Sequence, residues 1–319
     1  LYLALFPKLV MGPIVPYHEL EPALAQRTID AQDVSDGCFR FTIGLAKKAL
    51  LADALAGLVT GIWGDLASLT VLSAWLGLIG YALQLYFDFS GYSDMAIGLG
   101  RMLGFRFPEN FRYPYLCSSI SDFWRRWHIS LGSWFKEYLY FPLGGSRAGT
   151  LRTLRNLLLV WLATGLWHGA SWNYVLWGLY FGVLICLEKL LAPRFRAYPR
   201  KGLLAGLYRP VCLLLAVLGW VLFRAEDLPA TGRYFACLFG GAAGASAQAR
   251  LYLHDFWPVL LLGAVGATPL CAKLAGRLGA KLQPGVRAAV QAVLVLALLA
   301  CSTVWLLNGS FQSFVYFQF

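Results

Sequence analysis

The chain has 319 residues, of which 59% are hydrophobic and only 13% are charged. Soluble domains carry about 25% charged residues, so this composition, with a mean hydropathy of +0.60, excludes an ordinary soluble protein and indicates an integral membrane protein. The formal net charge of +11 does not indicate nucleic-acid binding, because the Lys and Arg residues lie in short blocks between apolar runs, as in cytoplasmic loops.

The first residues are already apolar, with neither an initiator Met nor the basic start of a signal peptide. We therefore expect the sequence to lack the N-terminal membrane segments of a longer protein. No repeat and no second domain is evident, so residues 1–319 are predicted to form a single membrane-embedded domain. The seven cysteines are scattered without a CxxC pair, which favours neither a disulfide nor a metal site.

Four apolar runs are predicted to cross the bilayer, which takes about 20 residues. They are 66–87, 203–223, 256–272 and 286–307. An earlier apolar segment, 38–63, is interrupted by Lys47, Lys48 and Asp53, so we expect it to be tilted or interfacial.

The stretch QLYFDFSGYSDMAIGLGRMLGF, residues 84–105, places Asp88 and Asp94 among apolar and aromatic residues. Acids at membrane depth are costly, and they either pair with a cation or have a function such as binding a substrate or donor. Candidate partners for an ion pair are Arg101, Arg112, Arg125 and Arg126. The FSGYS segment within the stretch is predicted to break the helix, giving an element that faces a cavity.

The stretch SDFWRRWHISLGSWFKEYLYFPLGGSR, residues 121–147, is predicted to form an amphipathic helix that is interfacial or re-entrant. Its apolar side consists of Phe123, Trp124, Trp127, Leu131, Trp134 and Tyr138. Its polar side carries Arg125, Arg126, Lys136 and Glu137, with His128 at the border. Two interpretations of Arg125, Arg126 and Lys136 stay open: contact with anionic lipid, or guidance of a phosphate-bearing donor such as a nucleotide thioester.

Residues 156–187 contain no charged side chain. Arg147, Arg152 and Arg155 precede this run and the basic loop 188–209 follows it, so both flanks are expected to be cytoplasmic. The run is too short for two full spans and too long for one. It is predicted to be re-entrant, with a short half-helix that enters, a longer helix that returns, and His168 at the HGASWN break, facing a cavity.

Loop charges predict the sidedness of the remaining spans. The loops 188–209 and 273–287 are strongly basic and are expected to be cytoplasmic. Between them, 224–255 is nearly balanced in charge and is expected to lie outside, as is the C-terminus.

Two of the four histidines, His128 and His168, lie in Trp-rich elements with Gly or Ser nearby. A lone histidine is commonly a core imidazole bonded to a backbone carbonyl. An apolar site, however, also keeps imidazole neutral and able to act as a general base for a hydroxyl, and no GxSxG, HExxH or Walker-type motif offers another centre. Tyr92, Trp167 and Asn173 complete the candidates for binding substrate or donor.

Five stretches together resemble the membrane-bound O-acyltransferase family, and most closely its bacterial alginate O-acetyltransferase branch. They are LFPKLVMGPI (5–14), YFDFSGYSDMAIGLGRMLGF (86–105), DFWRRWHISLGSWFKEYLYFPLGGSR (122–147), GLWHGASWNYVLWG (165–178) and FVYFQF (314–319). Family members carry further membrane segments before the first stretch, so the sequence resembles the C-terminal two thirds of a member.

The resemblance implies an all-α, polytopic fold: a helical shell with re-entrant and interfacial helices around a tunnel or funnel. It implies that His168 is the catalytic histidine and that His128 is a second catalytic position. The implied reaction moves an acyl group from a cytoplasmic thioester, such as acetyl-CoA, across the bacterial plasma membrane to an exported polysaccharide, with an extracytoplasmic hydrolase-like partner. It implies no metal, no tightly bound cofactor and no nucleic acid.

Two alternatives stay open at this point. D-alanyl transfer onto teichoic acids belongs to another branch of the same family and shares the FWRRWH and WHG elements. A proton-coupled transporter or flippase would also use broken helices and the buried Asp88, Asp94 and His168, although no repeat relates two halves of the chain.

Overall fold

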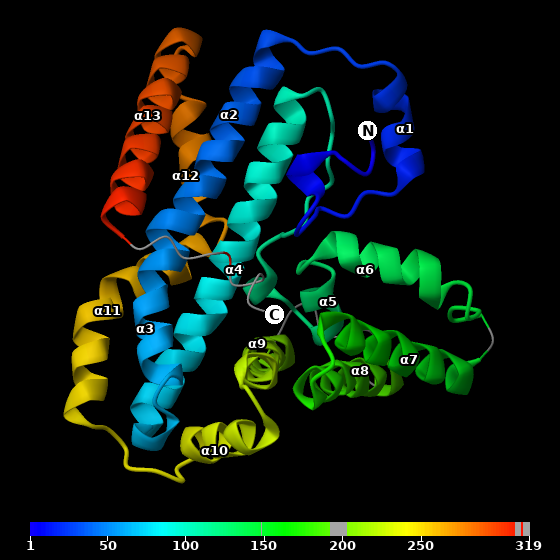
Figure 1. Cartoon of the computed structure of the whole chain (residues 1–319), viewed down its shortest axis with the longest axis vertical. Helices are drawn as coiled ribbons and strands as arrows, with labels where there is room; N and C mark the ends of the chain where they lie inside the picture. The colour runs from blue at the N-terminus through cyan, green and yellow to red at the C-terminus, as the bar shows by residue number, and fades with distance from the viewer. Residues whose placement is uncertain (148, 192–202, 310–313, 315–319) are drawn as a thin grey trace. The chain divides into compact units, whose positions relative to one another are not determined.

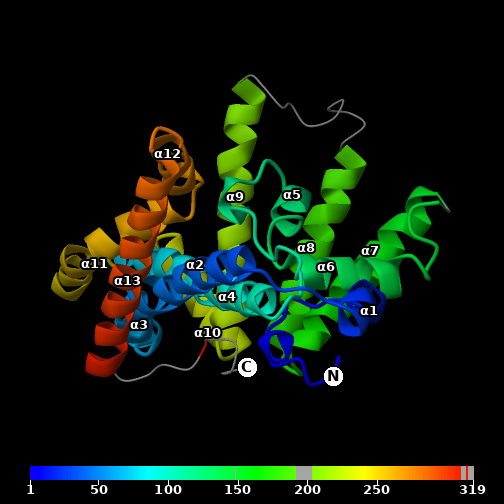
Figure 2. The same ribbon diagram turned by 90° about the horizontal axis from the view of Figure 1, so that it is seen from above.

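The computed structural model describes residues 1–147, 149–191, 203–309 and 314, and within these residues every regular element is a helix (Figures 1 and 2). The chain forms two compact units. One consists of Leu1–Ala56, Leu83–Arg112 and Pro258–Gln318, and the other is built from Gly57–Ala82 and Tyr113–Trp257. The helices, together with the apolar spans described below, confirm the expected all-α membrane fold.

The helices follow in chain order, and most are α-helices. They are α1 (Tyr17–Ala25), α2 (Ala31–Ala46), α3 (Asp53–Trp63), α4 (Val71–Met102), α5 (Ile120–Trp124), α6 (Ile129–Phe135), α7 (Thr150–His168), α8 (Trp172–Leu191), α9 (Leu203–Arg224), α10 (Leu228–Leu238), α11 (Ala247–Gly266), α12 (Leu270–Gly279) and α13 (Pro284–Asn308). Two π-helical segments are η2 (Lys47–Ala52) and η5 (Lys136–Tyr140), and three short 3₁₀ turns are η1 (Phe6–Lys8), η3 (Leu66–Ser68) and η4 (Pro114–Leu116).

Four helices among the described residues are long and apolar enough to cross a membrane: α4, α8, Gly206–Arg224 of α9, and α13. A fifth candidate is the pair α11 and α12, which is bent by 67°. Two of the predicted spans, 203–223 and 286–307, therefore correspond to α9 and α13. The predicted span 66–87 falls on α4 but is wrong in its bounds, because η3 precedes the helix and α4 continues to Met102. The fourth, 256–272, is wrong in its bounds, because α11 begins at Ala247 and the bend falls at Pro269, which caps α12. The predicted loop 273–287 is partly helical for the same reason.

The expected break at FSGYS is wrong, because α4 is one continuous helix of 32 residues. Gly91 in this segment lies against Gly44 of α2: a Cβ built on Gly91 would be 2.7 Å from the Gly44 carbonyl oxygen. The two glycines thus let α2 and α4, which run side by side in Figure 1, pack with their backbones in contact. The glycine is explained by close helix packing.

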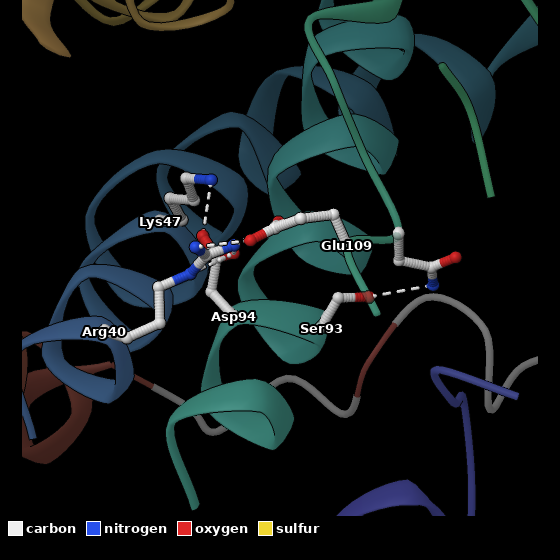
Figure 3. A network of polar contacts seen from close by, with 6 residues as sticks. Arg40, Lys47, Ser93, Asp94 and Glu109 are labelled. Carbon is white, nitrogen blue, oxygen red and sulfur yellow. Dashed lines mark hydrogen bonds and ion pairs between the residues drawn. The ribbon is translucent and has the colours of Figure 1, made fainter. Parts of the chain in front are cut away.

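A network of ion pairs joins α2 and η2 to α4 in the first unit (Figure 3). The carboxylate of Asp94 accepts Arg40 Nη2 at 2.5 Å and Lys47 Nζ at 2.6 Å, and Arg40 also binds Glu109 at 2.7 Å. Lys48 bridges Asp53 and Asp88, each at 2.7 Å.

The interpretation of Asp88 and Asp94 as ion-paired groups is therefore correct, but the candidate partners are wrong. Arg101, one of those candidates, binds Asp33 at 3.3 Å and Asp36 at 2.6 Å of α2. The observed partners lie about 40 to 54 positions earlier in the sequence, and only the packing of α2 on α4 brings them close.

In the second unit, α7 and α8 form a helical hairpin (Figures 1 and 2). The turn between them falls within HGASWN, as predicted, but α7 has 19 residues and α8 has 20. The prediction of a short entering half-helix is wrong because α7 begins at Thr150 and includes Arg152 and Arg155. The helices meet at Gly165 and Gly178, where a Cβ on Gly178 would lie 3.1 Å from the Gly165 Cα.

Candidate active site

The site begins at the N-terminus of α5, which is held by a buried carboxylate. Glu188 of α8 accepts the backbone N–H groups of Ile120 at 2.5 Å and Ser121 at 2.9 Å, together with the Ser121 hydroxyl at 2.7 Å and the Tyr208 hydroxyl at 2.7 Å. An anion is favourable at a helix N-terminus, where backbone N–H groups have no partner within the helix. Glu188 was expected in a loop, but it lies buried in α8 and fixes α5 to α8 and α9.

The polypeptide turns sharply between α5 and α6, so the expectation of one helix through 121–147 is wrong. α5 ends at Trp124, and α6 starts after His128, whose φ of 47° and ψ of 54° are left-handed. This conformation is uncommon for a residue other than glycine and costs about 1–2 kcal/mol. Of the predicted apolar side, Trp134 and Tyr138 are exposed instead of buried.

His128 is buried at 4% exposure and directly follows Trp127, a member of an aromatic cluster contributed by α5, the turn after α5, α7, α8 and α9. The members of the cluster are Phe123, Trp124, Trp127, Trp161, Trp177, Phe181, Trp220 and Phe223. Neighbouring ring centroids lie 4.7 Å apart for Trp124 and Trp161, and 4.8 Å apart for Trp127 and Trp220. The turn that carries His128 therefore follows directly on a residue of this packed cluster.

His168 is the last residue of α7 and lies at the turn of the helical hairpin, as predicted. Its imidazole is half-buried and contacts three aromatic rings, with centroids 4.9 Å from Trp167, 5.0 Å from Trp177 and 5.1 Å from Phe223. His168 therefore contacts the aromatic cluster through Trp177 and Phe223. The same cluster includes Trp127, the residue before His128.

Burial lowers the pKa of both histidines from 6.5 to about 3. A charge on His168 lowers the pKa of His128 further, which places the two imidazoles within electrostatic reach of each other. Both rings are therefore neutral at physiological pH, and each carries one N–H group and one unprotonated nitrogen. Such a pair can accept a proton from one group and donate a hydrogen bond to another.

A cavity of about 410 Å³ lies between α5, α6, η5 and α7, within the second unit. Its wall is mainly apolar and includes Trp124, Trp127, Leu131, Val160 and Trp161, with His128 among the lining residues. Thr164 also lines the cavity and precedes His168 by about one helical turn. The cavity has the size and the apolar character of a site for a small organic ligand.

Two of the three predicted donor-binding cations, Arg125 and Lys136, line this cavity and are exposed. The third, Arg126, is not on the lining, and its Nε lies 3.0 Å from the carboxylate of Asp122. The cations of the predicted basic face therefore have different surroundings. Arg125 and Lys136 lie at the cavity, whereas Arg126 lies in a local ion pair.

The remaining candidates are distributed over both units. Trp167 is 51% exposed beside His168. Asn173 is buried, and its amide donates to the Ala225 carbonyl at 2.6 Å, which ties α8 to the end of α9. Tyr92, Asp88 and Asp94 belong to the first unit, where the Tyr92 hydroxyl donates to the Pro7 carbonyl at 3.3 Å.

The sequence interpretation overlooked Trp220, Phe223 and Glu188. Trp220 and Phe223 share a face of α9 at a spacing of three residues, and this pairing of aromatic residues within a predicted span is the signal that could have identified them. No comparable signal marks Glu188, because its partners lie 68 and 20 positions away in the sequence.

Residues 1–222 match the MBOAT, membrane-bound O-acyltransferase, family. The chain is 47% identical over 242 residues to the probable alginate O-acetylase AlgI of Pseudomonas fluorescens, covering 75% of this chain and 47% of that protein.

Two further relatives are named as transferases. Identity is 40% over 233 residues to the peptidoglycan O-acetyltransferase of Helicobacter pylori, covering 72% of this chain and 44% of that protein. It is 30% over 198 residues to the teichoic acid D-alanyltransferase of Bacillus subtilis, covering 58% and 49%. The chain thus spans about half the length of the curated relatives it matches. From the match over residues 1–222 and these identities, the chain belongs to the membrane-bound O-acyltransferase family.

Proposed function

We propose that the protein is an O-acyltransferase, and specifically an O-acetyltransferase, of the bacterial cytoplasmic membrane. The donor is an acyl thioester on the cytoplasmic side, such as acetyl-CoA, and the acceptor is a hydroxyl of an exported cell-surface polysaccharide or of an extracytoplasmic hydrolase-like partner. Support comes from the relatives named as alginate O-acetylase and peptidoglycan O-acetyltransferase. D-alanyl transfer has weaker support, because the teichoic acid enzyme is only 30% identical over 58% of this chain.

The observation that carries the proposal is a cavity of about 410 Å³ lined by His128 and two cations. His168 does not line it but lies on α7 about one helical turn beyond the lining residue Thr164. Both imidazoles are neutral. The apolar wall suits an acyl chain and excludes water, which protects a thioester from hydrolysis. Arg125 and Lys136 supply positive charge where a nucleotide thioester carries phosphate groups.

The residues divide the chemistry between them. His168 accepts the proton as the hydroxyl oxygen attacks the thioester carbonyl, and His128 donates a hydrogen bond to the oxygen that becomes negative. The tetrahedral intermediate then expels the thiolate, which takes the proton from His168 and leaves as the thiol. The ester is formed, and both histidines return to their neutral state.

Substitution His168→Ala at the chromosomal locus tests the proposal. Loss of a general base is expected to reduce transfer by about 10²–10⁴-fold, measured as polysaccharide-bound acetate by mass spectrometry at equal protein level. The matched control is His18→Ala, which removes an exposed histidine of α1 and is expected to leave acetylation unchanged. Full acetylation in the His168→Ala strain would overturn the assignment.

His128→Asn is the companion variant. Asn tolerates the left-handed backbone of residue 128, so the turn is retained while the imidazole is lost. A smaller but clear loss of transfer is expected. Unchanged transfer would reduce His128 to a packing residue.

A further inference from the structure

A second cavity, of about 560 Å³, lies in the second unit. Neither His128 nor His168 lines it, and the function proposed above does not use it. We infer that this cavity binds a neutral, hydroxyl-rich saccharide unit of the acceptor. The inference rests on the proposed function for the identity of the ligand as an acceptor, whereas binding of the saccharide can be measured without any transfer.

The cavity is enclosed by the end of α3, η3, the start of α4 and the start of α11. Its polar lining residues are Asp65, Ser68, Ser73, Ser246, Gln248 and Tyr252. Ile62, Leu69 and Ala249 are buried and form an apolar floor. An apolar floor with converging polar groups is the usual composition of a small-molecule site.

Backbone hydrogen bonds make the wall of this cavity a defined structure. The first two N–H groups of α4, from Val71 and Leu72, donate to the carbonyls of Ala243 and Gly244, each at 3.0 Å. The Trp75 indole donates to the Leu238 carbonyl at 3.1 Å. The segment that leads into Ser246 and Gln248 is therefore fastened to α4, and the cavity is largely pre-formed.

Several polar groups on the lining retain hydrogen-bonding capacity. Among the described residues, neither the Tyr252 hydroxyl nor the exposed Gln248 amide has a hydrogen-bond partner. Contacts to the Asp65 side chain from the N–H groups of Ala67 and Ser68 involve only Oδ1. A hydroxyl donor, an amide and a carboxylate are complementary to sugar hydroxyls, which both donate and accept.

The charge of the lining selects among saccharides. Asp65 is the one charged residue among those that line the cavity in the described part of the chain. Hydrogen bonds from Ser68 lower its pKa, so it carries a negative charge at neutral pH. A carboxylate without a neighbouring lining cation disfavours a polyuronate and leaves neutral sugars as the favoured class.

The position of the cavity in the chain suits a role in acceptor selection. One wall comes from 246–252, which lies beyond the residues 1–222 that match the family. The charge pattern also predicts that 224–255 lies on the external side of the membrane, where an exported polysaccharide would be.

Binding to the purified full chain in lipid nanodiscs, measured by isothermal titration calorimetry, tests the inference. The probes are a neutral N-acetylglucosamine tetramer and a mannuronate tetramer of equal length. We expect the neutral tetramer to bind and the mannuronate tetramer to bind at least about tenfold more weakly. Gln248→Ala and Tyr252→Phe should each weaken the neutral tetramer about fivefold, the equivalent of one hydrogen bond of about 1 kcal/mol.

Asp65→Asn tests selectivity, and two surface variants provide controls. Asn retains an oxygen that can cap η3, so the local turn is kept while the negative charge is lost. Asp65→Asn should therefore improve mannuronate binding and reduce the preference for the neutral tetramer over mannuronate. Gln283→Ala and Tyr17→Phe change exposed residues outside the cavity and should bind like the wild type. Absence of neutral saccharide binding, a preference for mannuronate, or equal losses in the control variants would overturn the inference.

Measuring thioester turnover alongside saccharide binding distinguishes failure of this inference from failure of the proposed function. Thioester turnover from acetyl-CoA that depends on His168, together with failure of the binding tests, would overturn the saccharide site alone. Saccharide binding that responds to Gln248 and Asp65, without any thioester turnover, would support the site and overturn the transferase proposal.

Discussion

Glu188→Gln is the substitution with the most informative outcome. The carboxylate lies buried at 6% exposure, and four hydrogen bonds converge on it from Ile120, Ser121 and Tyr208. Glutamine has nearly the same shape, but it has only one acceptor oxygen, and its NH₂ group would face donors. The variant therefore removes the charge and about half of the hydrogen bonds without creating a cavity.

The expected cost follows from these contacts. A hydrogen bond to a charged group contributes about 1.5–3 kcal/mol, and loss of the anion at the N-terminus of α5 adds about 0.3–1 kcal/mol. A neutral Gln side chain costs less free energy to bury than a carboxylate, and this gain offsets part of the lost stability. A net destabilisation of about 2–4 kcal/mol remains, which lowers Tm by about 4–8 °C at about 2 °C per kcal/mol.

Thermal unfolding of the purified protein in detergent, followed by Trp fluorescence, measures this loss. Glu137→Gln is the matched control, because Glu137 is exposed in η5, and no change in Tm is expected. Transfer activity should fall with Tm in Glu188→Gln, since α5 leads to His128. An unchanged or raised Tm would refute the reasoning and show that desolvation of the buried charge outweighs its hydrogen bonds.

Three further predictions concern the histidines, the cavity and the hairpin. Because the pKa of His168 is lowered to about 3, its basic form persists as pH falls, so kcat/KM should stay flat from about pH 8 to 5; a decline with a midpoint near 6.5 would contradict this. Lys136→Gln should raise KM for acetyl-CoA severalfold but leave KM for a short acetyl thioester without phosphate unchanged; equal effects on both donors would exclude a phosphate contact. Gly178→Val should destabilise the hairpin by about 1–3 kcal/mol through overpacking, seen as a lower Tm. Gly206→Ala should leave Tm unchanged, because no atom lies within 4 Å of an added Cβ there. A stable Gly178→Val protein would show that α7 and α8 can separate.

The parts of the fold that sequence alone could predict are those encoded locally. The α9 and α13 spans follow from long apolar runs that each contain only one charged residue near the start. The turn at HGASWN follows from its Gly and Ser residues between two apolar segments. The choice of His128 and His168 as candidates also rests on a local signal, since both stand in Trp-rich elements with small residues nearby; their catalytic role stays a prediction. In each case the signal lies within a few residues of the feature it predicts.

The wrong predictions concern features that tertiary contacts decide. Gly91 was interpreted as a helix breaker, but Gly44 of another helix provides the contact that makes glycine necessary within α4. The helical wheel through 121–147 fails at His128, where a left-handed backbone conformation that has no local sequence signal separates α5 from α6. The length of α7 was underestimated because charged residues were assumed to end it.

The ion-pair network of α2 and α4 has a consequence for how this sequence can evolve. Asp94 is shared by Arg40 and Lys47, and Arg40 is in turn shared with Glu109 (Figure 3). Loss of any one member leaves an uncompensated charge in a partly buried site, at a cost that a second change can remove. Substitutions at these four positions should therefore be strongly epistatic, and in homologous sequences they should covary as a group.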